Sequence, residues 1–239
     1  MEASQFLERF RLLSREIQIN IQRLEKNIEQ LKKNPDNETI QKIQETTKNI
    51  HEYWDDFSGW VLISTLDDIN EARRNCVSGL IEVQSKITRS KKRALGPANQ
   101  HGVKIDTKNV AEAEVSTYIT YFEQFLDLLL LNAVKYSPRG YSVDVSSQWK
   151  DGAVIISIDS IGPLIEKHEK PLLGNKGFRA ANAIKTNKSG DGFGLNNVLK
   201  LAELLEIDIR FNLSHRKIVE FSSIPYSDFS VVIAIKNTV

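Results

Sequence analysis

The sequence predicts an α+β protein in which a long N-terminal helical hairpin or bundle is followed by an α/β sandwich, with a mixed sheet carrying helices on one face. Three observations lead to this prediction. Apolar residues recur at helical spacing over the first 96 residues, they alternate with period two after residue 140, and a stretch of loop composition separates the two patterns. Because strands and helices occupy separate runs beyond that stretch, an α+β domain is expected there.

The N-terminal 96 residues are predicted to be helical. Apolar side chains follow alternating steps of three and four over 10–31, 40–61 and 62–87, which is the pattern of amphipathic, coiled-coil-like helices. NPDN at 34–37 supplies a proline and capping residues for a break. Long helices with narrow apolar stripes cannot bury themselves, so we expect a homodimer through this stem. Packing against the chain's own C-terminal half is the alternative.

Residues 97–111 have loop composition and are predicted to link a helical dimerisation domain, 1–96, to a second domain, 112–239. In that second domain we expect a helix at about 112–135. Residues 141–159 alternate with period two around a Lys-Asp-Gly turn and predict a β-hairpin. The sequence then predicts a helix that begins near Leu195, followed by strands at 207–214 and 229–237.

Composition excludes several classes of partner. The 239 residues include 32 basic and 31 acidic side chains, a formal net charge of +1, so nothing indicates nucleic acid or a membrane surface as a partner. The basic run at 89–93 is more typical of a solvated helix end than of a binding patch. The single cysteine, Cys76, allows no disulfide within one chain and fits a reducing compartment. The longest apolar run falls short of the roughly 20 residues that span a bilayer. We expect a cytoplasmic protein.

A glycine-rich loop is the first candidate site. KSGDGFGL, 188–195, places Gly190, Gly192 and Gly194 directly before the helix that Leu195 opens. Glycine can take positive φ and come close to a ligand, and the free N–H groups of a helix N-terminus attract anions. The loop therefore predicts a phosphate site, with a plain glycine-rich hairpin loop as the alternative.

Four stretches of the second domain carry further motifs. They are LLLLNAVKYSP at 128–138, IDSIGPLI at 158–165, KGFRAANA at 176–183 and SGDGFGLNNVLKLA at 189–202. In this order and spacing they resemble the N box, first glycine box, F box and second glycine box of the histidine-kinase branch of the GHKL ATPases, over about residues 112–236. The resemblance implies a GHKL-type sandwich that binds ATP and Mg²⁺.

The N-box resemblance implies roles for three residues. Asn132 is expected to bind Mg²⁺ through its amide oxygen, a hard neutral ligand. Lys135, one turn on, offers a cation to the phosphates, and Tyr136 lines the nucleotide pocket. In the alternative interpretation Asn132 is an ordinary surface amide and Lys135 a solvated charge.

The polar segment between the glycine boxes, about 164–190, is expected to be a mobile lid over ATP. Phe178 and Arg179 match the aromatic and basic residues of the F box, and the resemblance implies that Arg179 reaches the γ-phosphate. In the alternative interpretation Phe178 belongs to the core.

The first glycine box departs from the family pattern. Ser160 stands where the adenine-binding aspartate usually sits, Gly162 is kept, and Leu164 replaces the second glycine. A hydroxyl can hydrogen-bond the exocyclic amine of adenine but lacks the strength of a carboxylate. Asp159 should point to the opposite face of the strand. We therefore expect weaker or altered recognition of adenine.

A second departure concerns water activation. Leu128 stands where kinases of the family often have another Asn and the ATP-hydrolysing relatives a Glu general base. Glu123 and Asp127 are near in sequence, but at about 100° per residue neither lies on that face of the helix. ATP should therefore bind without fast hydrolysis.

The third departure is that the helical half lacks the HELRTP phosphoacceptor stretch of the family. The best candidate acceptor is His51, on the flank of the apolar stripe, with Glu52 beside it to orient the imidazole and accept its proton. His-Glu pairs also arise on helix surfaces by chance. His101, His168 and His215 lie in loop or lid-like contexts.

These observations favour an ATP-binding, histidine-kinase-like protein that transfers the γ-phosphoryl group to a histidine and onward to an aspartate of a response-regulator receiver domain. The alternative is a degenerate scaffold or phosphotransfer protein that binds nucleotide without autokinase activity, favoured by Ser160, Leu128 and the missing acceptor stretch. A slow ATPase switch is disfavoured by Leu128.

Overall fold

The computed structural model describes residues 3–64, 66, 68–74, 76–188 and 192–236, and for 3–9, 48, 51–53, 55–60, 62, 63 and 71 it describes the backbone only. The chain forms two compact units, Met1–Asp68 and Ile69–Val239. The second unit therefore begins well before residue 96, the predicted end of the helical domain. No helix within the described ranges is both long and apolar enough to cross a membrane.

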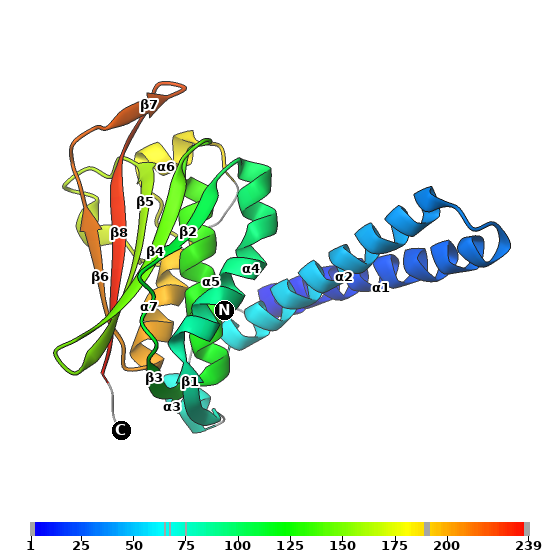
Figure 1. The fold of residues 1–239 in the computed structure, drawn as a ribbon, viewed down its shortest axis with the longest axis horizontal. Coiled ribbons are helices and arrows are strands. Elements are labelled where there is room, and N and C mark those ends of the chain that lie inside the picture. The colour runs from blue at the N-terminus through cyan, green and yellow to red at the C-terminus, as the bar shows by residue number, and fades with distance from the viewer. Residues whose placement is uncertain (1–2, 65, 67, 75, 189–191, 237–239) are drawn as a thin grey trace. The chain divides into compact units, whose positions relative to one another are not determined.

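The first unit is a helical hairpin, as predicted. It consists of α1 (Ala3–Lys33) and α2 (Asn37–Ser64), which pack side by side (Figure 1). The predicted break at NPDN is present, and Asp36 caps α2. The backbone N–H and the hydroxyl of Thr39 donate to the Asp36 carboxylate at 2.6 and 2.7 Å, and these bonds lower the pKa of Asp36.

The hairpin leaves much of its apolar surface exposed. Among the side chains that the structure describes in α1 and α2, Leu13 is the one large apolar residue that is buried, and the buried polar ones are Asn20, Thr39 and Thr46. A seam with so few buried apolar groups gives little hydrophobic stabilisation within one chain. The exposed large apolar side chains of the two helices are Phe10, Leu12, Ile21, Ile28, Ile40 and Trp54.

The helical prediction for 62–87 is wrong in its middle, at 78–82, whereas 69–74 and 83–87 are helical. The chain forms a short helix, α3 (Ile69–Arg74), and then a strand, β1 (Ser78–Glu82), which pairs antiparallel with β3 (Glu114–Tyr118). A Cβ on Gly79 would lie 2.8 Å from Cδ1 of Ile119, so the glycine allows close packing here. Strand pairing with a segment far along the chain overrode a helical spacing of apolar residues.

The predicted linker, 97–111, is also wrong. Residues 97–101 are the last turn of α4 (Val83–His101), and 104–108 form a strand, β2 (Lys104–Lys108). The helix ends at Gly102, whose φ of 66° lets Val103 N–H bond to the carbonyl of Ala98 at 2.9 Å. The loop-like composition of 97–101 suggested a linker, but Ala94 and Ala98 are buried, and their packing keeps this turn helical.

The second unit is built on one mixed sheet with the order β2-β4-β5-β8-β6, in which β2 runs parallel to β4 and the other neighbours are antiparallel. The predicted hairpin at 141–159 is confirmed, with Asp151 and Gly152 at positive φ in its turn. A short strand, β7, pairs with the beginning of β8. The remaining strands are β4 (Ser142–Lys150), β5 (Ala153–Pro163), β6 (Asp208–Leu213), β7 (Val219–Phe221) and β8 (Ile224–Lys236).

Helices α4, α5 (Ile119–Tyr136) and α7 (Gly194–Leu204) cover one face of this sheet (Figure 1). The predicted fold class is thereby confirmed. A 3₁₀ turn (Lys170–Leu172) and α6 (Ala181–Lys185) lie in the segment between β5 and α7. Fully buried side chains of the core include Phe122, Phe125, Val134, Ile156, Leu201 and Ile233.

Candidate functional site

Asn132 of α5 faces the beginning of α7. The leucine-rich side of α5 is buried, and Asn132 lies at the edge of that side, half-buried. Its amide oxygen is 3.9 Å from the point where a Cβ on Gly194 would stand. Two stretches far apart in the sequence thus meet, and they bring a neutral oxygen ligand to the N–H groups of a helix N-terminus.

The second glycine box packs tightly on the F box. Gly192 has a φ of 77°, and a Cβ there would lie 2.6 and 2.7 Å from the carbonyl carbon and oxygen of Gly177 and 2.9 Å from the carbonyl oxygen of Phe178. A glycine is therefore required at 192 so that its backbone can contact the backbone of Gly177 and Phe178. The sequence analysis did not foresee this reason for a glycine. Gly190 lies outside the described residues, and Leu195 is half-buried in the first turn of α7.

Arg179 braces the lid, the name that we keep for residues 164–190 between β5 and α7. Its guanidinium donates to the carbonyls of Ala183 and Lys188 at 3.1 and 2.8 Å. Phe178 is half-buried, and its N–H bonds to the carbonyl of Asn175. In this structure both F-box residues support the lid itself.

Two buried polar side chains close the base of the lid, and the sequence analysis missed both. Glu169, 5% exposed, accepts hydrogen bonds from the N–H groups of Ala181 at 2.7 Å and Glu166 at 2.9 Å. The amide of Asn182 donates to the carbonyl of Leu164 at 2.8 Å. The beginning of the lid is therefore tied to α6, and nothing in the local sequence pattern signals these long-range bonds.

Three groups that can carry positive charge converge one turn beyond Asn132. The Lys188 ammonium donates to the carbonyl of Lys135, and the Lys135 ammonium lies 5.1 Å from the ring centroid of Tyr136. Burial and the charge of Lys135 lower the pKa of Lys188. Burial and the charges of both lysines lower the pKa of His101, which lies at the C-terminal end of α4 and not in a loop.

No ion pair between either lysine and a carboxylate is present in the described part of the chain. Like charges held together in partial burial disfavour their charged forms, and an anion placed among them relieves this cost. The sequence analysis missed Lys188 and His101 because only the fold brings them to Lys135.

Ser160 lies on the sheet face that carries the helices. Its hydroxyl donates to the carbonyl of Phe229 on β8 at 3.2 Å, and Asp159 is exposed on the other face, as strand alternation predicts. Gly162 is buried, and a Cβ there would meet only ordinary contact, 3.7 Å from Cβ of Phe229. Leu164 is also buried.

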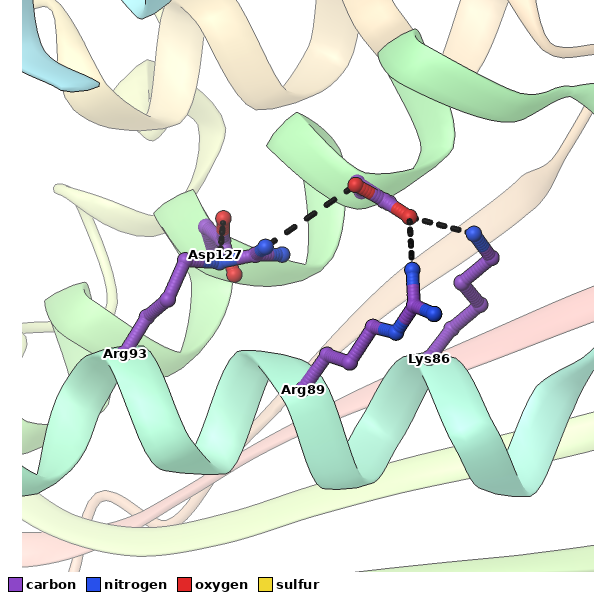
Figure 2. Close-up of polar contacts among 5 residues, drawn as sticks. Lys86, Arg89, Arg93 and Asp127 are labelled. Atoms are coloured by element: carbon purple, nitrogen blue, oxygen red, sulfur yellow. Dashed lines mark hydrogen bonds and ion pairs between the residues drawn. The ribbon is translucent and has the colours of Figure 1, made fainter. Parts of the chain in front are cut away.

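The two carboxylates of α5 point to α4. Glu123 contacts Lys86, Arg89 and Arg93, and Arg93 Nε lies 2.7 Å from an oxygen of Asp127 (Figure 2). Burial raises the pKa of Asp127 despite this partner. Two arginines of the basic run at 89–93 therefore serve packing between helices. Leu128, one turn before Asn132, is half-buried.

His51 and Glu52 lie on the backbone of α2, but their side chains are outside the described part of the structure. His168 is exposed in the lid, and Nδ1 of His215 lies 3.0 Å from the carbonyl of Ile165.

Comparison with known families gives one match to the second unit. The profile of the family described as "Histidine kinase-, DNA gyrase B-, and HSP90-like ATPase" matches residues 118–234. Among curated proteins, the sensor protein kinase GraS of Staphylococcus aureus (strain MRSA252) is 32% identical over 100 residues. That alignment covers 41% of this chain and 29% of the relative, so this chain matches less than a third of GraS.

Solved histidine kinases share the fold. Acinetobacter baumannii histidine kinase AdeS superposes with a TM-score of 0.54 at 17% identity, over 93% of this chain and 98% of the other. A mycobacterial sensor histidine kinase, MprB, gives a TM-score of 0.53 at 21% identity, over 68% of this chain and 100% of MprB. Full-length ShkA, solved in complex with AMPPNP, gives a TM-score of 0.57 at 15% identity, over 83% of this chain and 40% of the ShkA chain.

Proposed function

Because residues 118–234 belong to the histidine kinase-, DNA gyrase B- and HSP90-like ATPase family, we propose that this histidine-kinase-like protein binds ATP with Mg²⁺ and transfers the γ-phosphoryl group to a histidine. A receiver-domain aspartate of a response regulator would then take the phosphoryl group, as in two-component signalling. The solved relative ShkA, with the same fold, was crystallised with AMPPNP.

The observation that carries this proposal is the approach of the Asn132 amide oxygen to Gly194 at the N-terminus of α7. Phosphates at that end would meet free N–H groups and the positive end of the helix dipole. Asn132 would hold Mg²⁺, which neutralises phosphate charge and prefers oxygen ligands. The donor set therefore fits the ion.

Of the remaining site residues, some would contact the phosphates of ATP and others its nucleoside. Lys135 and Lys188 would face the phosphates, since neither pairs with a carboxylate in the described chain. Gly192 lets the loop that precedes α7 lie against the lid backbone at Gly177 and Phe178. Tyr136 and Ser160 would meet the nucleoside, the serine through the lone pairs of its hydroxyl.

We assign the acceptor role to His51. One imidazole nitrogen would attack the γ-phosphorus while the bond to the β-phosphate oxygen breaks and ADP leaves, and Glu52 would take the imidazole proton. Catalysis would come mostly from positioning and charge neutralisation.

A second copy of the chain is the partner that the hairpin favours. The exposed apolar side chains of α1 and α2 outnumber the large apolar ones that the described hairpin buries. A homodimer through this stem would cover them, as in four-helix bundles.

The degenerate scaffold stays as a second candidate because of Ser160. Its hydroxyl proton is committed to the carbonyl of Phe229, and no carboxylate takes the usual place of the adenine-binding aspartate. Nucleotide would then act as a conformational ligand only.

Incubation with γ-labelled ATP and Mg²⁺ tests the proposal. We expect an acid-labile, base-stable label in the parent protein, lost in His51→Ala and in Asn132→Ala. Matched controls are His168→Ala and Asn212→Ala, both at exposed positions, which should keep the label. A label that survives His51→Ala would move the acceptor elsewhere. No label, despite ATP binding in the same samples, would favour the scaffold.

A further inference from the structure

The C-terminal end of α7 is held by a side chain from α3. Arg73 Nη2 donates to the carbonyl of Glu203 at 3.1 Å and lies 3.3 Å from a carboxylate oxygen of Glu206. A cation at this end of a helix also complements its dipole. The buried side chain of Ala72 anchors α3, so Arg73 reaches α7 from a fixed position.

Glu206 stands in a backbone conformation that favours glycine. α7 ends with Ile207 N–H bonded to the carbonyl of Ala202 at 2.9 Å and Glu206 N–H to that of Glu203 at 3.3 Å, the pattern of a Schellman motif. Glu206 occupies the left-handed position of this motif with a φ of 56°. Glycine is the usual residue there because it has no Cβ.

Stability alone does not explain the glutamate. Its side chain is 78% exposed, and exposed ion pairs contribute little to folding. Strained residues persist where their side chains are used, commonly at functional sites. The pairing with Arg73 is the use that this structure offers.

α7 joins this contact to the nucleotide site. The helix has 11 residues and is therefore about 16 Å long. Its N-terminal residue, Gly194, faces Asn132, and Gly192 just before it touches the backbone of Gly177 with no room for a Cβ. A helix moves as a rigid body, so an axial shift at Glu206 would disturb these contacts at the other end.

We propose that Arg73 and Glu206 are positioning residues that fix α7 so that its N-terminus and Asn132 form the nucleotide site. This inference rests on the proposed ATP binding. α3 is the first element of the second unit in the chain, so the Arg73–Glu206 contact joins that first helix to α7 within the unit.

Glu206→Gly separates a positioning role from a purely structural one. A structural role predicts a lower melting temperature, whereas a positioning role predicts weaker ATP binding without a lower melting temperature. Glycine relieves the backbone strain, so the melting temperature without nucleotide should stay equal or rise by about 1–3 °C. Loss of the Arg73–Glu206 ion pair should nevertheless weaken ATP binding about fivefold, the lower end of typical coupling between sites. Both quantities can be measured by thermal unfolding and by calorimetric titration with ATP and Mg²⁺.

Arg73 variants complete the experiment. Arg73→Gln should weaken ATP binding at least as much as Glu206→Gly, because it removes the cation that holds both Glu203 and Glu206, and Arg73→Lys should restore part of it. Arg74→Gln is the matched control and should leave affinity unchanged, because within the described chain the Arg74 side chain bonds to the carbonyl of Asn70 in α3, at 3.4 Å, and to nothing in α7.

An ATP affinity of Glu206→Gly equal to that of the parent would overturn the positioning role. So would an Arg73→Gln protein whose affinity falls only in proportion to its stability. A parent protein that binds no ATP would overturn the proposed function and this inference together, a result distinct from the other two.

Discussion

Gly192→Ala tests whether close packing of the lid, at Gly177 and Phe178, on the loop just before α7 is needed for nucleotide binding. The added Cβ would lie within 2.6–2.9 Å of backbone atoms of Gly177 and Phe178, and these atoms cannot rotate away. The left-handed conformation costs a non-glycine residue about 1 kcal/mol, and the steric overlap about 1–3 kcal/mol more. The strain is relieved if the lid backbone at Gly177 and Phe178 moves away from Gly192, so it should appear in binding more than in unfolding.

At 1.4 kcal/mol for each factor of ten, a strain of about 2–4 kcal/mol predicts ATP binding that is weaker by about 30-fold to several hundredfold. Calorimetric titration with ATP and Mg²⁺ measures this loss. Gly152→Ala is the matched control, because Gly152 has nearly the same φ, 76°, with nothing within 4 Å of an added Cβ. It should lose a little stability and no affinity. A Gly192→Ala protein that binds ATP as tightly as Gly152→Ala would refute the reasoning.

Three further predictions follow from single side chains. Ser160→Asp should bind ATP about tenfold more tightly, with no gain for GTP, because a carboxylate accepts a stronger bond from the adenine amine; titration with both nucleotides measures this. Arg93→Met should lower the free energy of unfolding in urea by about 1–2 kcal/mol at pH 7, because it leaves the buried Asp127 carboxylate without its cation. The loss should shrink at acidic pH, since burial raises the pKa of Asp127 and the neutral acid needs no partner. ATP affinity should rise as the pH falls through the titration of His101, because its pKa is lowered in the free protein by burial and by Lys188 and Lys135, and phosphates would raise it. His101→Gln should flatten that pH profile in calorimetric titrations.

The sequence predicted those elements whose pattern is local. The hairpin at 141–159 carries its own alternation and turn, and the leucines of α5 mark its buried side. β1, β2 and β3 were missed, and the predicted helix at about 112–135 begins only at Ile119, because these strands pair with segments elsewhere in the chain. Pairing between strands that are distant in the sequence leaves no signal in a short stretch of residues. Around Leu80 this pairing overrode an apparent helical spacing of apolar residues.

The site residues also fall into those that the sequence predicted and those that it missed. Asn132 and the glycine loop were found because residue type and spacing carry their chemistry, and Gly194 does lie opposite Asn132. Glu169, Lys188 and His101 were missed because their roles depend on contacts that only the fold creates. Gly192 was selected for approach to phosphate, whereas in the structure its missing Cβ makes room for the backbone of the lid.

The distribution of charge on α5 bears on which acceptor the γ-phosphoryl group reaches. Rapid hydrolysis requires a base to activate water beside the phosphates. The carboxylates of this helix, Glu123 and Asp127, are both directed at the cations of α4, and an apolar residue, Leu128, stands one turn before Asn132. Water activation from α5 is therefore disfavoured. A bound ATP would persist until an imidazole, which brings its own nucleophilic nitrogen, meets the γ-phosphorus, and this favours a kinase or a nucleotide-gated scaffold over an ATPase.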